Sequence, residues 1–195
     1  MELKNGIPTT TAKNAEEWRS WLLKNHEKEK AIWLVIYHQK SDVASVQYDE
    51  AVDEALCFGW IDSKPNKRDD LSYYQYFSQR NPKSNWSRIN KGKIAKLMQA
   101  NKMESAGLRM IEVAKKNGTW DALNDVENLV VPPDMLSLFQ SEPEAQKNFE
   151  AFPPSVRRGI LEWIFNAKKE ETRSKRITET VALARQNIRA NQFRK

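Results

Sequence analysis

Residues 60–63 read WIDS, and residues 73–78 read YYQYFS. Both stretches are rich in aromatic and β-branched side chains, which are typical of strands. Residues 64–70, KPNKRDD, lie between them and are dense in turn-forming residues. The pattern predicts a β-hairpin with a long basic loop, in which one aromatic face of the second strand packs on the core and the other faces a cleft.

Hydrophobic patterns on either side of the hairpin predict one more strand and a series of helices. Residues 31–38, AIWLVIYH, form a short apolar run that predicts a central strand. Apolar residues at helical spacing predict helices near 14–25, 48–58, 86–100, 104–117, 154–167 and 171–189, and Ser141 with Glu144 fits a capping box. We therefore expect an α+β protein, with a small antiparallel sheet of about three strands packed with helices and an all-helical C-terminal segment.

The length of 195 residues fits one large domain or two small ones. Residues 119–131 are expected to be irregular or extended, and Pro132 and Pro133 close this stretch. We predict an α+β domain over residues 1–128 and a helical domain over residues 129–195.

The net charge of +6 is unevenly distributed. Residues 64–102 hold 10 Lys and Arg against 2 Asp and Glu, and residues 156–195 hold 11 against 4. The intervening segments are acidic, so the basic segments are either solvated faces that the acidic ones neutralise or a surface for a polyanion. The first interpretation is favoured, because neither basic segment carries a nucleic-acid-binding motif.

Composition also limits location and chemistry. No run of 18 apolar residues is present, so no membrane span is expected, and the first residues show no export signal. The single cysteine, Cys57, excludes an internal disulfide framework and a cysteine-rich zinc site, and it favours a reducing cytoplasm.

Several enzyme templates are missing from the sequence. With six glycines, the chain has no dinucleotide fingerprint, no P-loop and no nucleophile elbow. His26 and His38 are not at metal-ligand spacing, and Cys57 at the end of a predicted helix is better explained as a small buried residue than as a nucleophile. We expect neither a metal nor a cofactor.

The hairpin and the start of the next helix bring together an acid, an arginine, hydroxyls and large aromatics. The hairpin should place Asp62 near residues 73–77, and Arg80 beside a helix N-terminus would form an anion site. The candidate ligand-binding residues are Trp60, Asp62, Tyr73, Tyr76, Arg80, Ser84, Trp86, Ser87 and Asn90. A structural interpretation stays open, with an Asp62–Arg80 salt bridge, a Ser84 helix cap, and two core tryptophans.

Several blocks of the chain resemble a known family. They are residues 48–63 (YDEAVDEALCFGWIDS), 77–80 (FSQR), 84–90 (SNWSRIN), 153–158 (PPSVRR) and 171–177 (ETRSKRI), in that order. They are similar to the YdeI/OmpD-associated family, also called bacteriocin-protection proteins. The resemblance implies a bacterial protein linked to resistance against bacteriocins or antimicrobial peptides, and it implies no catalytic residue.

Three functions are consistent with these features. The first is a binding module whose aromatic and arginine-lined cleft takes a small anionic ligand or a protein partner. The second is an enzyme of unknown reaction with Asp62 as acid or base. The third is a nucleic-acid-binding protein that uses the basic segments 64–102 and 156–195.

Overall fold

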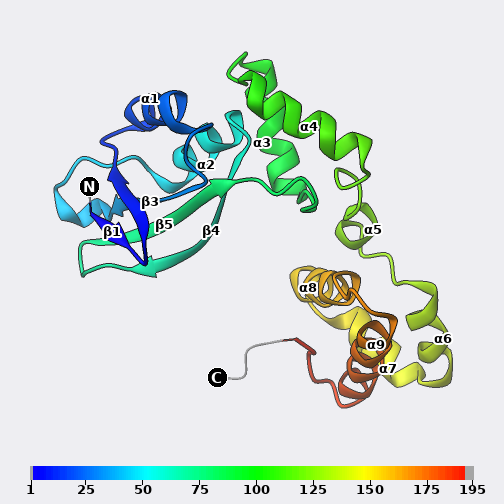
Figure 1. Cartoon of the computed structure of the whole chain (residues 1–195). Coiled ribbons are helices and arrows are strands. Elements are labelled where there is room, and N and C mark those ends of the chain that lie inside the picture. Colours follow the sequence, from blue (N-terminus) through cyan, green and yellow to red (C-terminus); the bar gives the residue numbers. More distant parts are fainter. Residues whose placement is uncertain (1, 192–195) are drawn as a thin grey trace. The chain divides into compact units, whose positions relative to one another are not determined.

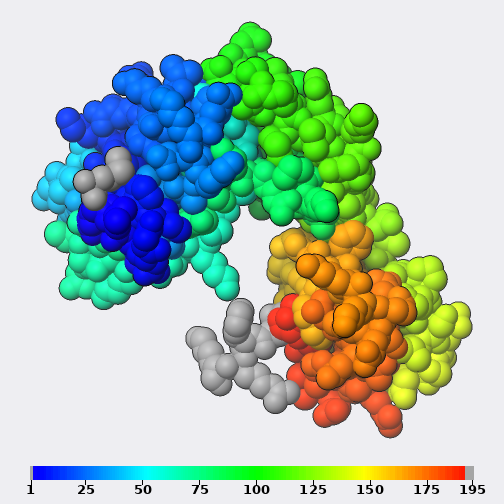
Figure 2. All heavy atoms as spheres, viewed as in Figure 1, coloured from blue at the N-terminus to red at the C-terminus, as the bar shows by residue number. Residues whose placement is uncertain are grey.

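The computed structural model describes residues 2–191 and forms two compact units. The N-terminal unit spans Met1–Asp121, and the C-terminal unit spans Ala122–Lys195. Figure 1 shows a sheet with helices in the first unit and helices in the second, and Figure 2 shows that side chains fill the space between the ribbons of each unit. That residues 1–128 and 129–195 are separate domains stays a prediction.

The N-terminal unit is built on a mixed sheet, which has five strands in the described part of the chain, in the order β1-β2-β3-β5-β4. The strands are β1 (Leu3–Lys4), β2 (Ile7–Thr11), β3 (Ala31–Tyr37), β4 (Trp60–Lys67) and β5 (Ser72–Gln79). The α+β class, the hairpin and the central strand are confirmed. The prediction of about three antiparallel strands is wrong, because β1 and β2 extend the sheet.

The strand β2 runs parallel to β3, and α1 (Ala15–Asn25) makes the crossover between them. Residues Thr9–Thr11 pair with Trp33–Val35 in this βαβ unit. The sequence of β2, IPTTT, has little apolar alternation and contains a proline, so it does not have the pattern by which strands are recognised. Its pairing with β3, rather than its own side chains, makes it a strand.

Alternation along β3 separates the two faces of the sheet. Ile32, Leu34 and Ile36 belong to the main core, together with residues of α1, α2 (Tyr48–Cys57), α3 (Arg88–Gln99) and α4 (Ser105–Lys116). Trp33 and Val35 point to the opposite face, because successive side chains of a strand alternate. Both faces of β3 are therefore buried, which explains its continuous apolar sequence.

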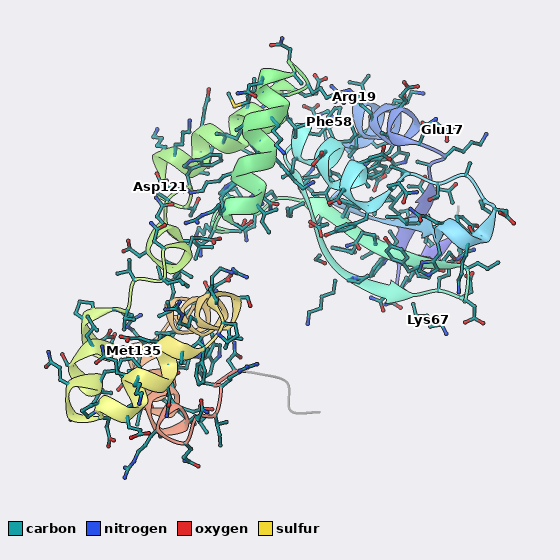
Figure 3. All side chains as sticks on the ribbon, turned by 180° about the vertical axis from the view of Figure 1, so that it is seen from behind. Glu17, Arg19, Phe58, Lys67, Asp121 and Met135 are labelled. Atoms are coloured by element: carbon teal, nitrogen blue, oxygen red, sulfur yellow. The ribbon has the colours of Figure 1, made fainter. Side chains whose placement is uncertain are left out.

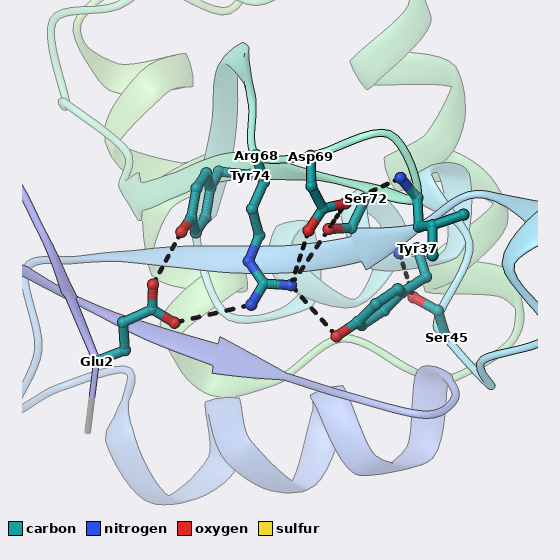
Figure 4. Close-up of polar contacts among 8 residues, drawn as sticks. Glu2, Tyr37, Ser45, Arg68, Asp69, Ser72 and Tyr74 are labelled. Atoms are coloured by element: carbon teal, nitrogen blue, oxygen red, sulfur yellow. Dashed lines mark hydrogen bonds and ion pairs between the residues drawn. The ribbon is translucent and has the colours of Figure 1, made fainter.

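The opposite face carries a smaller aromatic cluster, which a polar network of Arg68 borders (Figure 4). The Arg68 guanidinium donates to the Tyr37 hydroxyl at 3.3 Å and to Ser72 Oγ at 3.2 Å. It lies 3.5 Å from Asp69 and 4.0 Å from Glu2, which also accepts the Tyr74 hydroxyl at 3.0 Å. The network ties the N-terminal residues to the loop between β4 and β5.

A charge network around the buried Glu54 holds the helices of the N-terminal unit together. Arg19 on α1 pairs with Glu54 on α2 at 2.7 Å and with Glu104 just before α4. Its guanidinium lies 5.2 Å from the Phe58 ring, and Figure 3 shows these two residues on adjoining segments. Because Glu54 is 4% exposed, this pairing is what makes its burial tolerable.

The C-terminal unit is helical, as expected. Its helices are α5 (Asn124–Glu127), α6 (Pro133–Ser141), α7 (Pro143–Ala151), α8 (Pro154–Phe165) and α9 (Glu170–Arg185). They enclose their own core, which includes Met135, Phe139, Phe149 and Ile160. The predicted capping box is wrong, because Ser141 is the last residue of α6 and its hydroxyl donates to Leu138 O at 2.8 Å.

Candidate functional site

The nine candidate residues lie in four places. Trp60 is core: it is 1% exposed, and its Nε1 donates to His26 O at 3.2 Å. Tyr76 lies on the opposite face of the sheet, where its ring packs against Trp33 with centroids 4.9 Å apart. Asp62, near the start of β4, and Tyr73, near the start of β5, lie on the hairpin, and the remaining five residues follow β5.

Asp62 contacts a residue that the sequence did not indicate. The Tyr48 hydroxyl, at the first position of α2, donates to Asp62 Oδ2 at 2.6 Å. Nothing in the spacing of residues 48 and 62 predicts this contact, since it depends on how α2 packs across β4. Packing between α2 and β4 therefore brings a phenol and a carboxylate together on the edge strand of the sheet.

A groove of about 490 Å³ opens beside this pair. We call it the tyrosine groove, and Tyr48, Pro65, Asn66, Lys67, Tyr73 and Gln75 line it. The Tyr73 ring is half-buried and packs against His38 with centroids 5.4 Å apart. Lys67 lies at the far end of β4 from the helices (Figure 3). The volume is in the range typical of small-molecule sites, about 300–1,000 Å³.

A β-bulge shapes the floor of the groove. The pairing of β4 with β5 shifts between Asp62, which faces Phe77, and Pro65, which faces Gln75. Gln75 is 2% exposed, and its amide nitrogen donates to Ser63 O inside the bulge. A bulge re-aims the side chains next to it, and here it separates Asp62 from the wall that Pro65 and Asn66 form.

The surroundings of Tyr48 are electronegative. Partial burial and the hydrogen bond to Asp62 raise the pKa of Tyr48 well above its usual range, and the charges of Asp62 and Asp49 add to this effect. Burial also raises the pKa of Tyr73. Both phenols are therefore neutral at physiological pH.

Arg80 belongs to a second group of candidate residues, those that follow β5. It is 5% exposed, and its guanidinium stacks on the Trp86 ring at 3.7 Å from the centroid. Its Nη2 donates to Asn85 O at 2.5 Å, and its Nε has no hydrogen-bond partner within residues 2–191. Burial lowers the pKa of Arg80 to about 10, and the charge of Asp62 partly opposes this shift.

No carboxylate among residues 2–191 forms an ion pair with Arg80. The Asp62–Arg80 salt bridge of the structural interpretation is therefore not formed, although Asp62 acts on Arg80 through space. Arg19, which is only partly buried, has two carboxylate partners. Arg80 thus carries a buried charge that the described residues leave unneutralised.

The polar residues after Arg80 end one turn and begin a helix. Ser84 Oγ donates to Asn81 O at 2.7 Å, and Ser87 is the N-cap of α3, where its Oγ accepts the Asn90 amide at 3.3 Å. Trp86 is fully buried against Trp120, with centroids 5.0 Å apart. Arg80, Trp86 and the start of α3 therefore form one local cluster, which we call the arginine cluster.

Beyond these two sites, the described residues show few groups suited to catalysis or metal binding. Cys57 is buried, and burial and the charge of Glu54 raise the pKa of its thiol to about 11. Residues 2–191 contain no group of three or more His, Cys, Asp or Glu side chains placed to hold a metal ion. No helix in the same range is long and apolar enough to cross a membrane.

The fold and these sites define a two-unit α+β protein with candidate binding sites on its sheet-containing unit. Residues 10–110 match the family described as a domain of unknown function, DUF8412, and residues 128–187 match the family described as Bacteriocin-protection, YdeI or OmpD-Associated. The first match spans just over half of the chain, so the chain belongs to the DUF8412 family, and its C-terminal segment is of the YdeI/OmpD-associated type. No curated protein and no solved structure matches the chain.

The two matches divide the blocks of the resemblance. Residues 153–158 and 171–177 lie inside the YdeI/OmpD-associated match. Residues 48–63 and 77–90 lie inside the DUF8412 match instead. Both candidate sites therefore lie in the part of the chain that belongs to the family of unknown function.

Proposed function

We propose that the N-terminal unit is a binding module for a small ligand with an anionic group, and that Arg80 holds the anion. The observation that supports this function is the buried guanidinium of Arg80, which lacks a carboxylate partner among the described residues. Taking a charge out of water costs several kcal/mol unless an opposite charge or a full set of hydrogen bonds compensates it. A bound carboxylate or phosphate would supply that compensation.

The surroundings of Arg80 favour an anion. Trp86 stacks on one face of the guanidinium and leaves the donors at its edge for planar recognition. The N-terminus of α3 begins at the neighbouring Ser87, and helix N-termini favour negative charge. Arg80 donates to Asn85 O, and its buried Nε has no acceptor among the described residues.

Thermal unfolding with inorganic phosphate tests this proposal. The variants are Arg80→Met, which keeps much of the stacking surface, and Arg109→Met, which removes an exposed arginine of α4. Phosphate stabilises most proteins by exclusion from their surface, so the informative quantity is the difference between variants. We expect a saturable rise in Tm for the wild type and Arg109→Met that Arg80→Met lacks. Equal responses of all three proteins to phosphate would refute the proposal.

The family description suggests the biological setting. We propose that the chain contributes to resistance against bacteriocins or antimicrobial peptides from the cytoplasm, consistent with its single buried cysteine. Because the net charge of +6 repels cationic peptides at long range, an indirect role is favoured over direct capture. Survival of sensitive bacteria that produce the wild type or Arg80→Met, under bacteriocin challenge, tests this role. Equal survival with and without the chain would exclude it.

The nucleic-acid alternative has less support. Several cations of the basic segments have intramolecular partners: Lys67 with Asp70, Lys93 with Asp53, Arg158 with Glu162, Arg173 with Asp134 and Arg185 with Glu142. Catalysis with Asp62 as acid or base stays a hypothesis. In it, the Tyr48 hydroxyl would be the hydrogen-bond partner of Asp62.

A further inference from the structure

We propose that the tyrosine groove is a second binding site, which takes the positively charged head of a small organic ammonium compound. The site does not depend on an anion at Arg80, because its walls come from α2 and the hairpin end of β4 and β5. Its ligand class follows from the aromatic walls, the charge beside them and the acceptor on the floor.

The walls offer aromatic surface of the kind that holds cations. Two phenol rings, Tyr48 and Tyr73, line the groove together with the apolar ring of Pro65. Aromatic faces attract ammonium groups, and the attraction grows as the cation leaves water. Packing against His38 orients the Tyr73 ring, so part of the wall is organised before a ligand arrives.

The charge next to the groove is negative. Asp62 does not line the groove. Its carboxylate accepts the hydrogen bond of the Tyr48 hydroxyl at 2.6 Å, so it lies directly beside the Tyr48 side of the wall. Asp49 is the next carboxylate that acts on Tyr48, and Lys93 holds it only loosely, at 3.4 Å. An ammonium head in the groove would interact favourably with both carboxylates.

The remaining polar groups are compatible with a cation. The Lys67 ammonium, which would repel one, is bound to Asp70 at 3.0 Å and is largely exposed to solvent. The amide nitrogen of Gln75 donates to Ser63 O, so the polar atom of this side chain that the bond leaves over is its carbonyl oxygen, an acceptor. The groove thus presents aromatic faces and acceptors, and its one cationic wall residue is already paired.

Titration of the full chain with choline, followed by NMR of the tyrosine ring protons, tests the proposal. The neutral isostere 3,3-dimethylbutan-1-ol has the same shape without the charge. We expect choline to shift the Tyr48 and Tyr73 resonances in a saturable way and to bind about tenfold more tightly than the isostere. Binding of the isostere as tightly as choline, or no response to choline, would overturn the proposal.

Matched variants test whether the Asp62 carboxylate contributes to choline binding. Asp62→Asn should weaken choline binding about tenfold, whereas Asp42→Asn should leave it unchanged. Asp42 is an exposed carboxylate at a left-handed position, φ 55°, which asparagine adopts readily. Tyr73→Leu provides a second test if Asp62→Asn folds poorly, because it removes a π face and keeps apolar bulk. Unchanged choline affinity in a folded Asp62→Asn or Tyr73→Leu would contradict the assignment, whatever the phosphate response of Arg80.

Discussion

The Tyr48 hydroxyl donates a 2.6 Å hydrogen bond to the Asp62 carboxylate and so joins the first residue of α2 to β4. The bond fixes one wall of the tyrosine groove and directs the phenol oxygen toward the acid. It also makes the phenol proton harder to remove, because the tyrosinate would lie against a carboxylate.

Tyr48 should be among the last of the five tyrosines to ionise. A raised pKa in the folded state means that the phenol proton stabilises the fold below about pH 10, and that this contribution is lost as pH rises further. Tyr48→Phe should therefore remove the highest-pH phase of an ultraviolet tyrosinate titration, and Asp62→Asn should shift that phase to lower pH. A titration of Tyr48→Phe that keeps the late phase would contradict the hydrogen bond.

The buried charge of Arg80 should lower the stability of the N-terminal unit, whereas its aliphatic chain and its stacking on Trp86 should raise it. Burial lowers the pKa of Arg80 to about 10, below its unfolded value, so at neutral pH the proton favours the unfolded chain. Arg80→Ala, which also loses the contact with Trp86, should destabilise the N-terminal unit by about 2–3 kcal/mol in urea unfolding. Arg80→Met should lose less than half of that. Equal losses in the two variants would mean that the charge itself stabilises the fold.

Local sequence predicted the elements whose own residues determine their structure. The apolar run of β3 and the helical spacing around Trp18 and Leu22 both led to correct assignments. The strand β2 escaped prediction because Pro8 and a row of threonines become a strand only through pairing with β3, and β1 escaped because it has two residues and exists through pairing with β2. Contacts between distant segments, rather than local propensity, decided this part of the fold.

The candidate sites also combine contacts that local sequence predicted with contacts that depend on packing between distant segments. Arg80 and Trp86 are six residues apart, and a short turn brings them together, so proximity in sequence was a sufficient guide. The partner of Asp62 was missed because Tyr48 reaches it only when α2 packs across β4. Gln75 was missed because a buried amide inside an aromatic strand has no recognisable pattern, and its role depends on the bulge at Ser63.

The contact between α4 and the end of α2 should require glycine at position 107. A Cβ added there would lie 2.3 Å from the carbonyl oxygen of Cys57, which is backbone and cannot move aside cheaply. Gly107→Ala should lower the free energy of unfolding by about 1–3 kcal/mol or more. Gly92→Ala on α3 is the matched control, because nothing lies within 4 Å of its added Cβ, and it should stabilise the chain by about 0.5–1 kcal/mol. A neutral effect of Gly107→Ala in urea unfolding would show that α4 is not packed this closely.

The C-terminal unit should depend on pH through the pair of Arg173 and Asp134. Two hydrogen bonds of 2.7 and 2.9 Å join the start of α9 to the first turn of α6, and they lower the pKa of Asp134. Because the folded-state pKa is depressed, the contribution of the carboxylate is complete above its unfolded value of about 3.9 and is lost as pH falls below it. Asp134→Asn should destabilise the chain at neutral pH by about 0.5–1 kcal/mol, since the pair is partly exposed.

Glu144→Gln is the control for this pair. Glu144 occupies the first turn of α7, as Asp134 does in α6, but it forms no ion pair with any residue from 2 to 191. Both substitutions remove a carboxylate that the helix dipole favours, so the larger effect of Asp134→Asn measures the interaction with Arg173. Thermal unfolding between neutral pH and the acid range should show the two variants converging as pH falls. A constant gap between them at all pH values would place the effect of Asp134→Asn outside the ion pair.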